Sequence, residues 1–515
     1  MNTVLAADIT LPHIDYAAIT PILILLGAGC VGILAEALVP RPLRYLVQTL
    51  LSVAAQVAGL VMVIVLAGRQ VLTAGDAIAI DGPALFLQGS ILVLGLMATL
   101  LIAERNVERG GWFVAQAAVT AGTEADAHQA RQEPSQTEIF PLSLFAFGGM
   151  MLFVSANDLL TMFVALEVFS LPLYLMCGLA RRRRLLSQEA AVKYFLLGAF
   201  SSAFFVYGVA MLYGFAGTVE LSGISHAALS SGRNDLLLFI GLAMLAIGLL
   251  FKGAAVPFHV WTPDVYQGAP TPVTALMAAC TKVAAFGAIL RVLYVAFLNS
   301  RWDWRPVIGV IAVLTMVIGA VLAVTQTDIK RLLAYSSIAN AGYVLTGILA
   351  MKQEGISSAL FYLATYGFTV IAAFGLLTLV RDGDGEASHL SRWAGLGRKS
   401  PVLAGVFTFL LLSFAGIPLT SGFTSKFAVF SAALDGGQTT LVIFGVISSI
   451  VLAFPYLRVV VMMYLSEPAA DAPTVAVPGV LTSASLTIGA VVTLLLGVVP
   501  GPLLDLARHA AIFVG

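Results

Sequence analysis

Three lysines and one glutamate lie inside segments that are otherwise apolar and long enough to cross a membrane: Lys252, Lys282, Lys426 and Glu167. A lysine at the bilayer centre costs about 2.5 to 3.5 kcal/mol on insertion scales, so a chain that keeps several there is expected to use them. Lys282 follows Pro272 by ten residues, which is about 15 Å along a helix and close to the midplane. Because desolvation favours a neutral amine over an ammonium ion, such a lysine can exchange a proton near neutral pH. Proton transfer is therefore our first hypothesis.

Two of these lysines accompany predicted interruptions of their helices. Lys252 precedes Pro257 by five residues, and because proline removes a backbone donor, the helix should break there. Lys426 follows a second group of helix-breaking residues, namely Gly416, Pro418 and Gly422. Interrupted helices with ionisable side chains mark the ion path in secondary transporters. The alternative is that the lysines snorkel to the headgroups, which their depth in the apolar runs disfavours.

Glu167, Lys193 and His259 complete the candidate site. An unpaired, ionised glutamate among apolar neighbours is costly, so we expect Glu167 to be protonated or paired with a cation such as Lys252. The alternative is a permanently neutral acid that joins two helices by a hydrogen bond. Lys193 lies near the start of an apolar run. Its ammonium either extends to the lipid headgroups or adds a cation near Glu167 or at a proton inlet. His259 follows Pro257 and either relays a proton, because imidazole titrates near neutrality, or caps the loop.

These residues predict a switch. If Glu167 moves toward Lys252, the ammonium is stabilised and holds its proton; if Glu167 moves away, the proton can pass toward Lys282. A change of one pKa unit corresponds to about 1.4 kcal/mol. The interaction energy of one buried ion pair is large enough to produce such a change.

The composition describes a polytopic, all-α membrane protein. Of 515 residues, 59% are hydrophobic and 10% are charged, with a mean hydropathy of +0.97, beyond the range of soluble proteins. The net charge is zero and does not suggest nucleic acid as a partner. Cys30, Cys177 and Cys280 lack C-x-x-C spacing, so we expect no metal, cofactor or redox centre in this chain. No phosphate-binding glycine motif supports transport driven by ATP, and the opening residues lack the basic region of a cleaved signal.

Fourteen apolar runs have the length of membrane spans. They are too long and too uniformly apolar for strands of a barrel. The runs lie near 18–39, 46–67, 82–102, 139–155, 158–180, 191–213, 236–262, 271–298, 306–325, 332–350, 356–380, 402–434, 438–466 and 479–499.

Basic residues predict the orientation of these spans. We assign successive loops alternately to the two sides of the membrane. Fifteen of the 27 lysines and arginines then fall on one side and five on the other, while seven lie within or beside apolar runs. The basic side should face the cytoplasm or its equivalent, together with the polar loop 103–138, and both termini should face away. The run Arg181 to Arg184 is most simply a topology anchor. Asp328, Lys330 and Arg331 fit a turn at the membrane edge, or alternatively part of a cytoplasmic water inlet.

The chain divides into four predicted parts. Residues 1–138 hold three helices and the polar loop, and residues 467–515 hold a last helix. Between them, 139–300 and 301–466 each hold five spans, one of which is broken. A repeat of five spans reverses orientation with each copy, so we expect two inverted repeats with broken helices.

Several motifs resemble one family. The string VPFHVWTPDVYQGAPTPV and Lys282 in CTKVAAFG are similar to the antiporter-like subunit N family of the proton-translocating NADH-quinone oxidoreductase, respiratory complex I. FVALEVFSLPLY, AVKYFLLGAFSSA, TQTDIKRLLAYSSIANAGY and SFAGIPLTSGFTSKF extend the resemblance over roughly residues 139–466.

The resemblance implies a fourteen-helix subunit that translocates protons while other subunits pass electrons from NADH to quinone. FMN and iron-sulfur clusters are implied in those partner subunits and no cofactor in this chain. The resemblance makes Glu167 and Lys252 an ion pair, Lys282 the central relay, Lys426 a group in the exit half and Lys193 an accessory lysine. Neighbouring antiporter-like subunits and the lipid bilayer are the expected partners, and a bacterial plasma membrane is the expected location, with the mitochondrial inner membrane as the less favoured one. Two alternatives are a subunit of a multisubunit Na+/H+ antiporter and a membrane scaffold whose polar residues only join helices.

Overall fold

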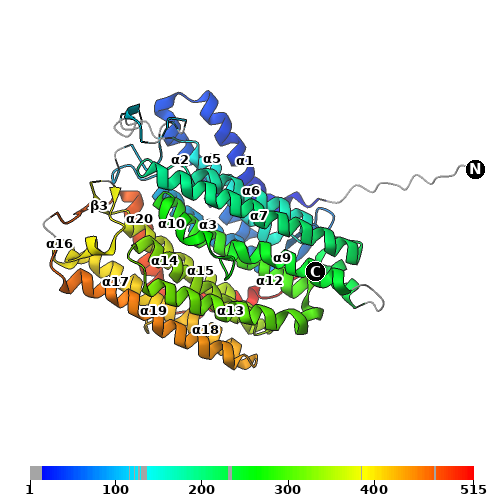
Figure 1. Cartoon of the computed structure of the whole chain (residues 1–515). Helices are drawn as coiled ribbons and strands as arrows, with labels where there is room; N and C mark the ends of the chain where they lie inside the picture. The colour runs from blue at the N-terminus through cyan, green and yellow to red at the C-terminus, as the bar shows by residue number, and fades with distance from the viewer. Residues whose placement is uncertain are drawn as a thin grey trace, which may run out of the picture.

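The computed structural model describes residues 14–514, except 109, 115, 117, 121, 126–127, 129–135, 230–234, 384 and 469–470. Arg109, Arg131 and Arg233, which entered the charge count above, lie outside the described residues. The described chain is a bundle of helices (Figure 1), and each of the fourteen predicted runs falls on a helix or on a pair of helix segments. The all-α membrane fold is therefore confirmed.

Eleven described helices are long and apolar enough to cross a membrane. Two further spans, α5 and α17, are shorter, and α14 carries more polar residues. The spans are α1 (Tyr16–Leu38), α2 (Arg41–Val65), α3 (Gly82–Ile102), α5 (Ile139–Ser155), α6 (Leu159–Cys177), α7 (Arg184–Ala216), α9 (Asp235–Gly253) with α10 (Trp261–Gly268), α11 (Thr271–Leu276) with α12 (Lys282–Arg291), α13 (Arg301–Val324), α14 (Ile329–Ile348), α15 (Gln353–Leu377), α17 (Pro401–Ala415) with α18 (Ser421–Asp435), α19 (Thr439–Leu465) and α20 (Val480–Val498). The short elements are β1 (Val71–Thr73), β2 (Ile78–Ile80), α8 (Leu221–Ala228), β3 (Val380–Asp382), β4 (Gly385–Glu386), α16 (Leu396–Lys399), β5 (Thr474–Val475) and α21 (Gly501–Ala510).

Two spans are broken where the sequence predicts it. α9 ends at Gly253, Ala254 has a positive φ of 58°, and α10 begins only at Trp261. α17 ends before Gly416, whose φ of 86° lies in the left-handed region that favours glycine, and α18 begins at Ser421. The division into inverted repeats stays a prediction.

The central span contains a feature that the sequence analysis did not predict. α12 is flanked by two π-helical segments, Met277–Thr281 and Val292–Ala296. The most apolar part of this span is completely buried, and α12 packs against α3, α5, α9 and α15. A π-helical turn inserts an extra residue into the helix, and such insertions are frequent at functional sites. Lys282 is the residue that directly follows the first of them.

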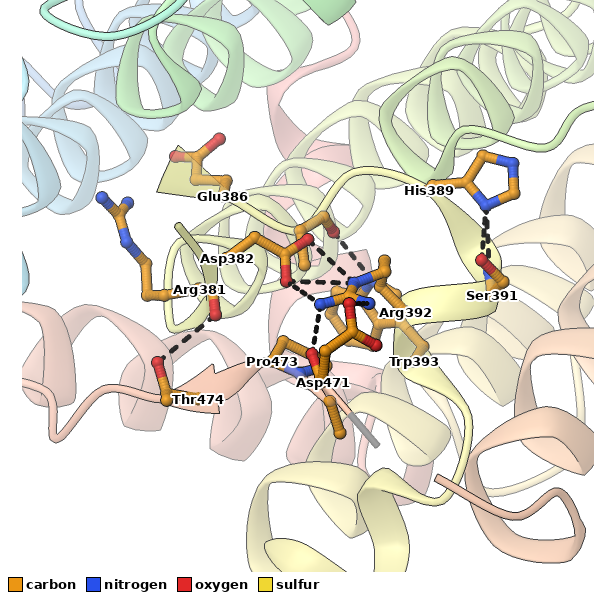
Figure 2. A network of polar contacts seen from close by, with 12 residues as sticks. Arg381, Asp382, Glu386, His389, Ser391, Arg392, Trp393, Asp471, Pro473 and Thr474 are labelled. Carbon is orange, nitrogen blue, oxygen red and sulfur yellow. Dashed lines mark hydrogen bonds and ion pairs between the residues drawn. The ribbon is translucent and has the colours of Figure 1, made fainter. Parts of the chain in front are cut away.

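The loops gather at two ends of the bundle as the alternating assignment predicts. At one end, β3 pairs with β4 and β5, which joins the loop after α15 to the loop before α20. Arg392 in the same region donates to Asp382 at 2.7 Å and Asp471 at 2.8 Å, as Figure 2 shows. At the other end, β1 pairs with β2, and the C-terminal residues lie there in Figure 1. Which end faces the cytoplasm stays a prediction.

Candidate functional site

Lys252 is buried among aromatic rings in the last turn of α9. Its ammonium lies 5.3 Å from the ring centroid of Phe169, 5.1 Å from that of Tyr174 and 5.2 Å from that of Tyr194. Its Nζ also donates to the hydroxyl of Tyr174 at 3.4 Å. Rings attract a cation through their electron-rich faces without carrying a net charge. The pocket therefore holds the ammonium without fixing a counter-ion beside it.

Glu167 lies on the same helix as Tyr174 but does not form an ion pair with Lys252. The carboxylate is partly exposed and accepts a hydrogen bond of 2.5 Å from Ser202 on α7. Lys252 contacts the same helix, α6, at the rings of Phe169 and Tyr174. The direct pair that the sequence analysis considered is therefore not formed in this structure, where the carboxylate binds Ser202 and the ammonium lies among the rings.

Lys282 occupies the centre of the bundle with 3% of its surface exposed. Its Nζ donates to the backbone carbonyl of Ser337 on α14 and lies 5.8 Å from the ring centroid of Tyr366 on α15. Neither contact supplies a negative charge. A helix carbonyl normally accepts a bond within its own helix, so the ammonium shares an acceptor with α14.

Lys426 on α18 contacts the end of α17 across the break between these two helices. Its Nζ donates to the carbonyls of Phe414 at 2.8 Å and Ala415 at 3.1 Å and to the hydroxyl of Ser449 at 2.8 Å. These carbonyls belong to the last turn of α17, where the helix dipole places partial negative charge. A Cβ at Gly416 would lie 3.1 Å from Cδ of this lysine. Glycine at this position therefore provides both the positive φ and the space for the lysine.

Aromatic side chains link Lys282 to Lys426 and extend from Lys252 to α10. Tyr194, which faces Lys252, stacks on Trp261 with centroids 4.6 Å apart, and α10, which carries Trp261, packs against α14. On the other side of Lys282, Tyr366 lies 6.0 Å from Phe414, whose carbonyl binds Lys426.

Two buried hydroxyl groups near these side chains are available to bind water. The buried hydroxyls of Tyr194 and Thr262 make no hydrogen bond with the described protein atoms. Such groups are usually satisfied by ordered water. A small cavity between Lys426 and Tyr366 is lined by hydroxyl and amide side chains, among them Asn340, Thr369 and Ser425.

Lys193 lies apart from Glu167. Its Nζ binds Asp264 on α10 and Glu189 on α7, each at 2.7 Å, and 41% of its side chain is exposed. Asp264 also binds Arg331 at 2.6 Å. The accessory lysine therefore ties α7 to α10 and α14, and Asp264 is the residue that the sequence analysis missed. Its only sequence signal was its place in the motif VPFHVWTPDVYQGAPTPV, which also holds Pro257 and His259.

His259 lies in the break between α9 and α10 and is half-buried. Its carbonyl accepts from the backbone N–H of Thr262 at 2.9 Å, which starts α10. The backbone makes this contact, while the side-chain Nδ1 has no hydrogen-bond partner among the described residues, so the choice between capping and a proton relay stays a prediction. The described residues include no group of three or more His, Cys, Asp or Glu side chains that could hold a metal ion.

A buried ion pair anchors the far end of α12. Arg291 and Asp81 are 2.7 Å apart and have no exposed side-chain surface. Asp81 caps α3 through the N–H of Ala84 and also accepts from Val514 at 3.1 Å. The segment from Lys282 to Arg291 is therefore fixed at its far end, where the chain terminus packs.

The sequence of this chain is similar to those of known proteins over most of its length. A family model described as "NADH:quinone oxidoreductase/Mrp antiporter, TM" matches residues 156–451. The chain is 67% identical over 515 residues to NADH-quinone oxidoreductase subunit N of Salinispora arenicola, with 99% of this chain and 100% of the relative covered. It is 60% identical over 508 residues to the subunit N of Saccharopolyspora erythraea, with 98% and 99% covered.

Solved structures agree. A chain of respiratory complex I from Thermus thermophilus with bound aureothin has a TM-score of 0.76 at 31% identity, with 95% of this chain and 99% of that chain covered. A chain of the Mrp complex from Dietzia sp. has a TM-score of 0.78 at 24% identity, with 96% and 97% covered. The second likeness concerns the fold alone.

Proposed function

The chain belongs to the NADH:quinone oxidoreductase/Mrp antiporter transmembrane family, within its subunit N branch, and we propose that it translocates protons along its row of buried lysines. As a membrane-arm subunit of an NADH-quinone oxidoreductase, it is part of a translocase. Electron transfer from NADH to quinone belongs to other subunits, which would hold the FMN and iron-sulfur clusters. The bacterial relatives and the apolar helices support a plasma membrane location.

One observation carries the proposal: Lys252, Lys282 and Lys426, the three buried lysines of this row, are each held by uncharged groups. Lys252 meets rings and a phenol, Lys282 a carbonyl and a ring, and Lys426 carbonyls and a hydroxyl. An ammonium paired with a fixed carboxylate keeps its proton, whereas one held by neutral acceptors can release it when a nearby charge moves. The row is therefore suited to passing protons rather than to storing charge.

Glu167 is the proposed moving charge. In this structure it binds Ser202 rather than Lys252, which corresponds to the state in which the lysine is free to release its proton. A swing of the carboxylate toward Tyr174 would stabilise the ammonium and reload Lys252. Neighbouring antiporter-like subunits are the proposed source of the charge movement that drives this change.

The test compares Lys252→Met with Lys352→Met in the assembled complex. Lys352 is exposed at the start of α15, so its replacement controls for the loss of a charge. Proton uptake per NADH in inverted vesicles should fall in the first variant and stay unchanged in the second. Equal pumping in both would contradict the proposal. The alternative, a Na+/H+ antiporter subunit, predicts that a Na+ ionophore abolishes the proton uptake of the parent complex.

A further inference from the structure

A polar cavity opens at the end of the bundle where most basic residues gather. It offers water a volume of about 50 Å³ and lies over the junction between α10 and α11, residues 267–271. Arg181, Arg182 and Arg183 line one part of it. Lys330, Glu386 and Thr271 line another part, which we call the base of the cavity because it adjoins the first turns of α11 and α14. The cavity therefore borders the end of the span that carries Lys282.

The four-arginine run is part of this cavity rather than only a surface anchor. Arg181 and Arg184 are buried, with 4% and 5% of their surfaces exposed. Arg182 binds Glu108 at 3.0 Å. Arg183 donates to Ser388 and to the carbonyl of Glu386, each at 2.9 Å. The run joins the loop after α3 to the β3–β4 hairpin and so fixes the cavity wall.

Glu386 bridges two helices at the base of the cavity. Its carboxylate lies 2.6 Å from the ammonium of Lys330 on α14 and accepts a hydrogen bond from the hydroxyl of Thr271, the first residue of α11. Burial raises the pKa of Glu386, but the charge of Lys330 and the hydrogen bonds outweigh it, so its pKa lies below the usual range. The contact is therefore an ion pair at neutral pH.

Polar groups continue below this pair toward Lys282. Thr274 lies one turn beyond Thr271 and donates to the carbonyl of Tyr266 at 3.2 Å. α14, which carries Lys330, also supplies the Ser337 carbonyl that binds Lys282. Glu386 thus holds together the two helices that lead from the cavity to the central lysine.

We propose that the Glu386–Lys330 pair is a gate between this cavity and Lys282, and that its opening admits water and protons from this end of the bundle. The proposal rests on the proton translocation proposed above and names its entrance. Both side chains are positioning residues: they control access to Lys282 and do not themselves carry the transferred proton.

Breaking one partner of a buried pair leaves an uncompensated charge, whereas replacing both removes the cause of opening. Glu386→Gln should therefore let Lys330 draw water to the base of the cavity. Combining Glu386→Gln with Lys330→Met should close the base again. Asp382→Asn is the matched control, because Asp382 lies in the same hairpin and pairs with Arg392, while Glu386 points away from that cluster (Figure 2).

The experiment measures water access at Thr274→Cys in assembled complexes whose Cys30, Cys177 and Cys280 are replaced by alanine. Inverted vesicles are treated with a charged, membrane-impermeant methanethiosulfonate. Labelling should accelerate about tenfold or more in Glu386→Gln, which is a tenfold shift in the open population. It should return to within about threefold of the parent in the double variant and stay unchanged in Asp382→Asn. Ala285→Cys, which lies past Lys282 and is buried, should stay unlabelled throughout.

Lys330→Met provides a second way to break the pair if Glu386→Gln does not assemble, and it should open the base to a similar degree. Labelling that stays at the parent rate in an assembled single variant would overturn the gate, as would equal labelling in the single and double variants. Proton uptake by the parent complex is recorded in parallel. A parent that pumps while its gate variants label normally rejects the gate and leaves the proposed function standing, whereas a parent that does not pump rejects the proposed function itself.

Discussion

Replacing Lys282 by arginine separates a proton relay from a structural cation, because the change keeps the charge and adds donors. The ordinary pKa of a guanidinium lies at least about 2 units above that of an ammonium, which is about 2.7 kcal/mol. The neutral form that a relay needs would therefore be at least about a hundredfold rarer at any given pH. We expect Lys282→Arg to abolish pumping although its positive charge is retained.

The surroundings of Lys282 add a second cost. The ammonium has one carbonyl acceptor, that of Ser337, and one ring, that of Tyr366, within reach. A guanidinium has five donors, and each donor left unsatisfied in a buried site costs about 1 to 3 kcal/mol. Assembly must therefore be checked, by NADH oxidation with an artificial acceptor and by native gel.

The assay is NADH-driven proton uptake in inverted vesicles, with Lys399→Arg as the control at an exposed lysine of the loop before α17. The control should pump at the parent rate. Parent-level pumping by a normally assembled Lys282→Arg complex would refute the relay assignment, because it would mean that a permanently charged group suffices at this position.

Two further outcomes follow from the same structure. Glu167→Gln should lower pumping while assembly survives, and Glu167→Asp should be milder because the charge is kept; undiminished pumping by the Gln variant would make the acid structural. From the asymmetry of basic residues, cysteines at positions 2 and 120 should be labelled from opposite sides of the membrane by an impermeant reagent, and labelling of both from one side would contradict the predicted orientation.

The sequence predicts the spans and both breaks well because each depends on local chemistry. A run of apolar residues must form a helix in a bilayer, and Pro257 and Gly416 cannot continue one. The depth of the lysines follows from the same counting. The π-helical turn before Lys282 is different, since nothing in MAACT distinguishes it from an ordinary helix. It forms where neighbouring helices determine the packing.

Pairings between distant residues are the part that the sequence could not provide. Glu167 and Lys252 are an acid and a base within the fifth and seventh spans, and the simplest expectation is a direct pair. Their contacts instead depend on how α6, α7 and α9 pack together. In this packing Ser202 on α7 binds the carboxylate of Glu167, and Tyr174 on α6 binds the ammonium of Lys252. The role of Asp264 was missed for the same reason: its partners Lys193 and Arg331 lie 71 and 67 residues away.

The two broken spans place their lysines near the carboxyl ends of half-helices, and this location has a physical consequence. Lys252 is in the last turn of α9, and Lys426 binds the last carbonyls of α17. The partial negative charge at such an end attracts an ammonium, yet it amounts to only about half an elementary charge. A full carboxylate would hold the proton too tightly for release, and a purely apolar site would not hold it at all. Half-helix ends lie between these limits, so a moderate change in a neighbouring charge is enough to decide whether the lysine keeps its proton.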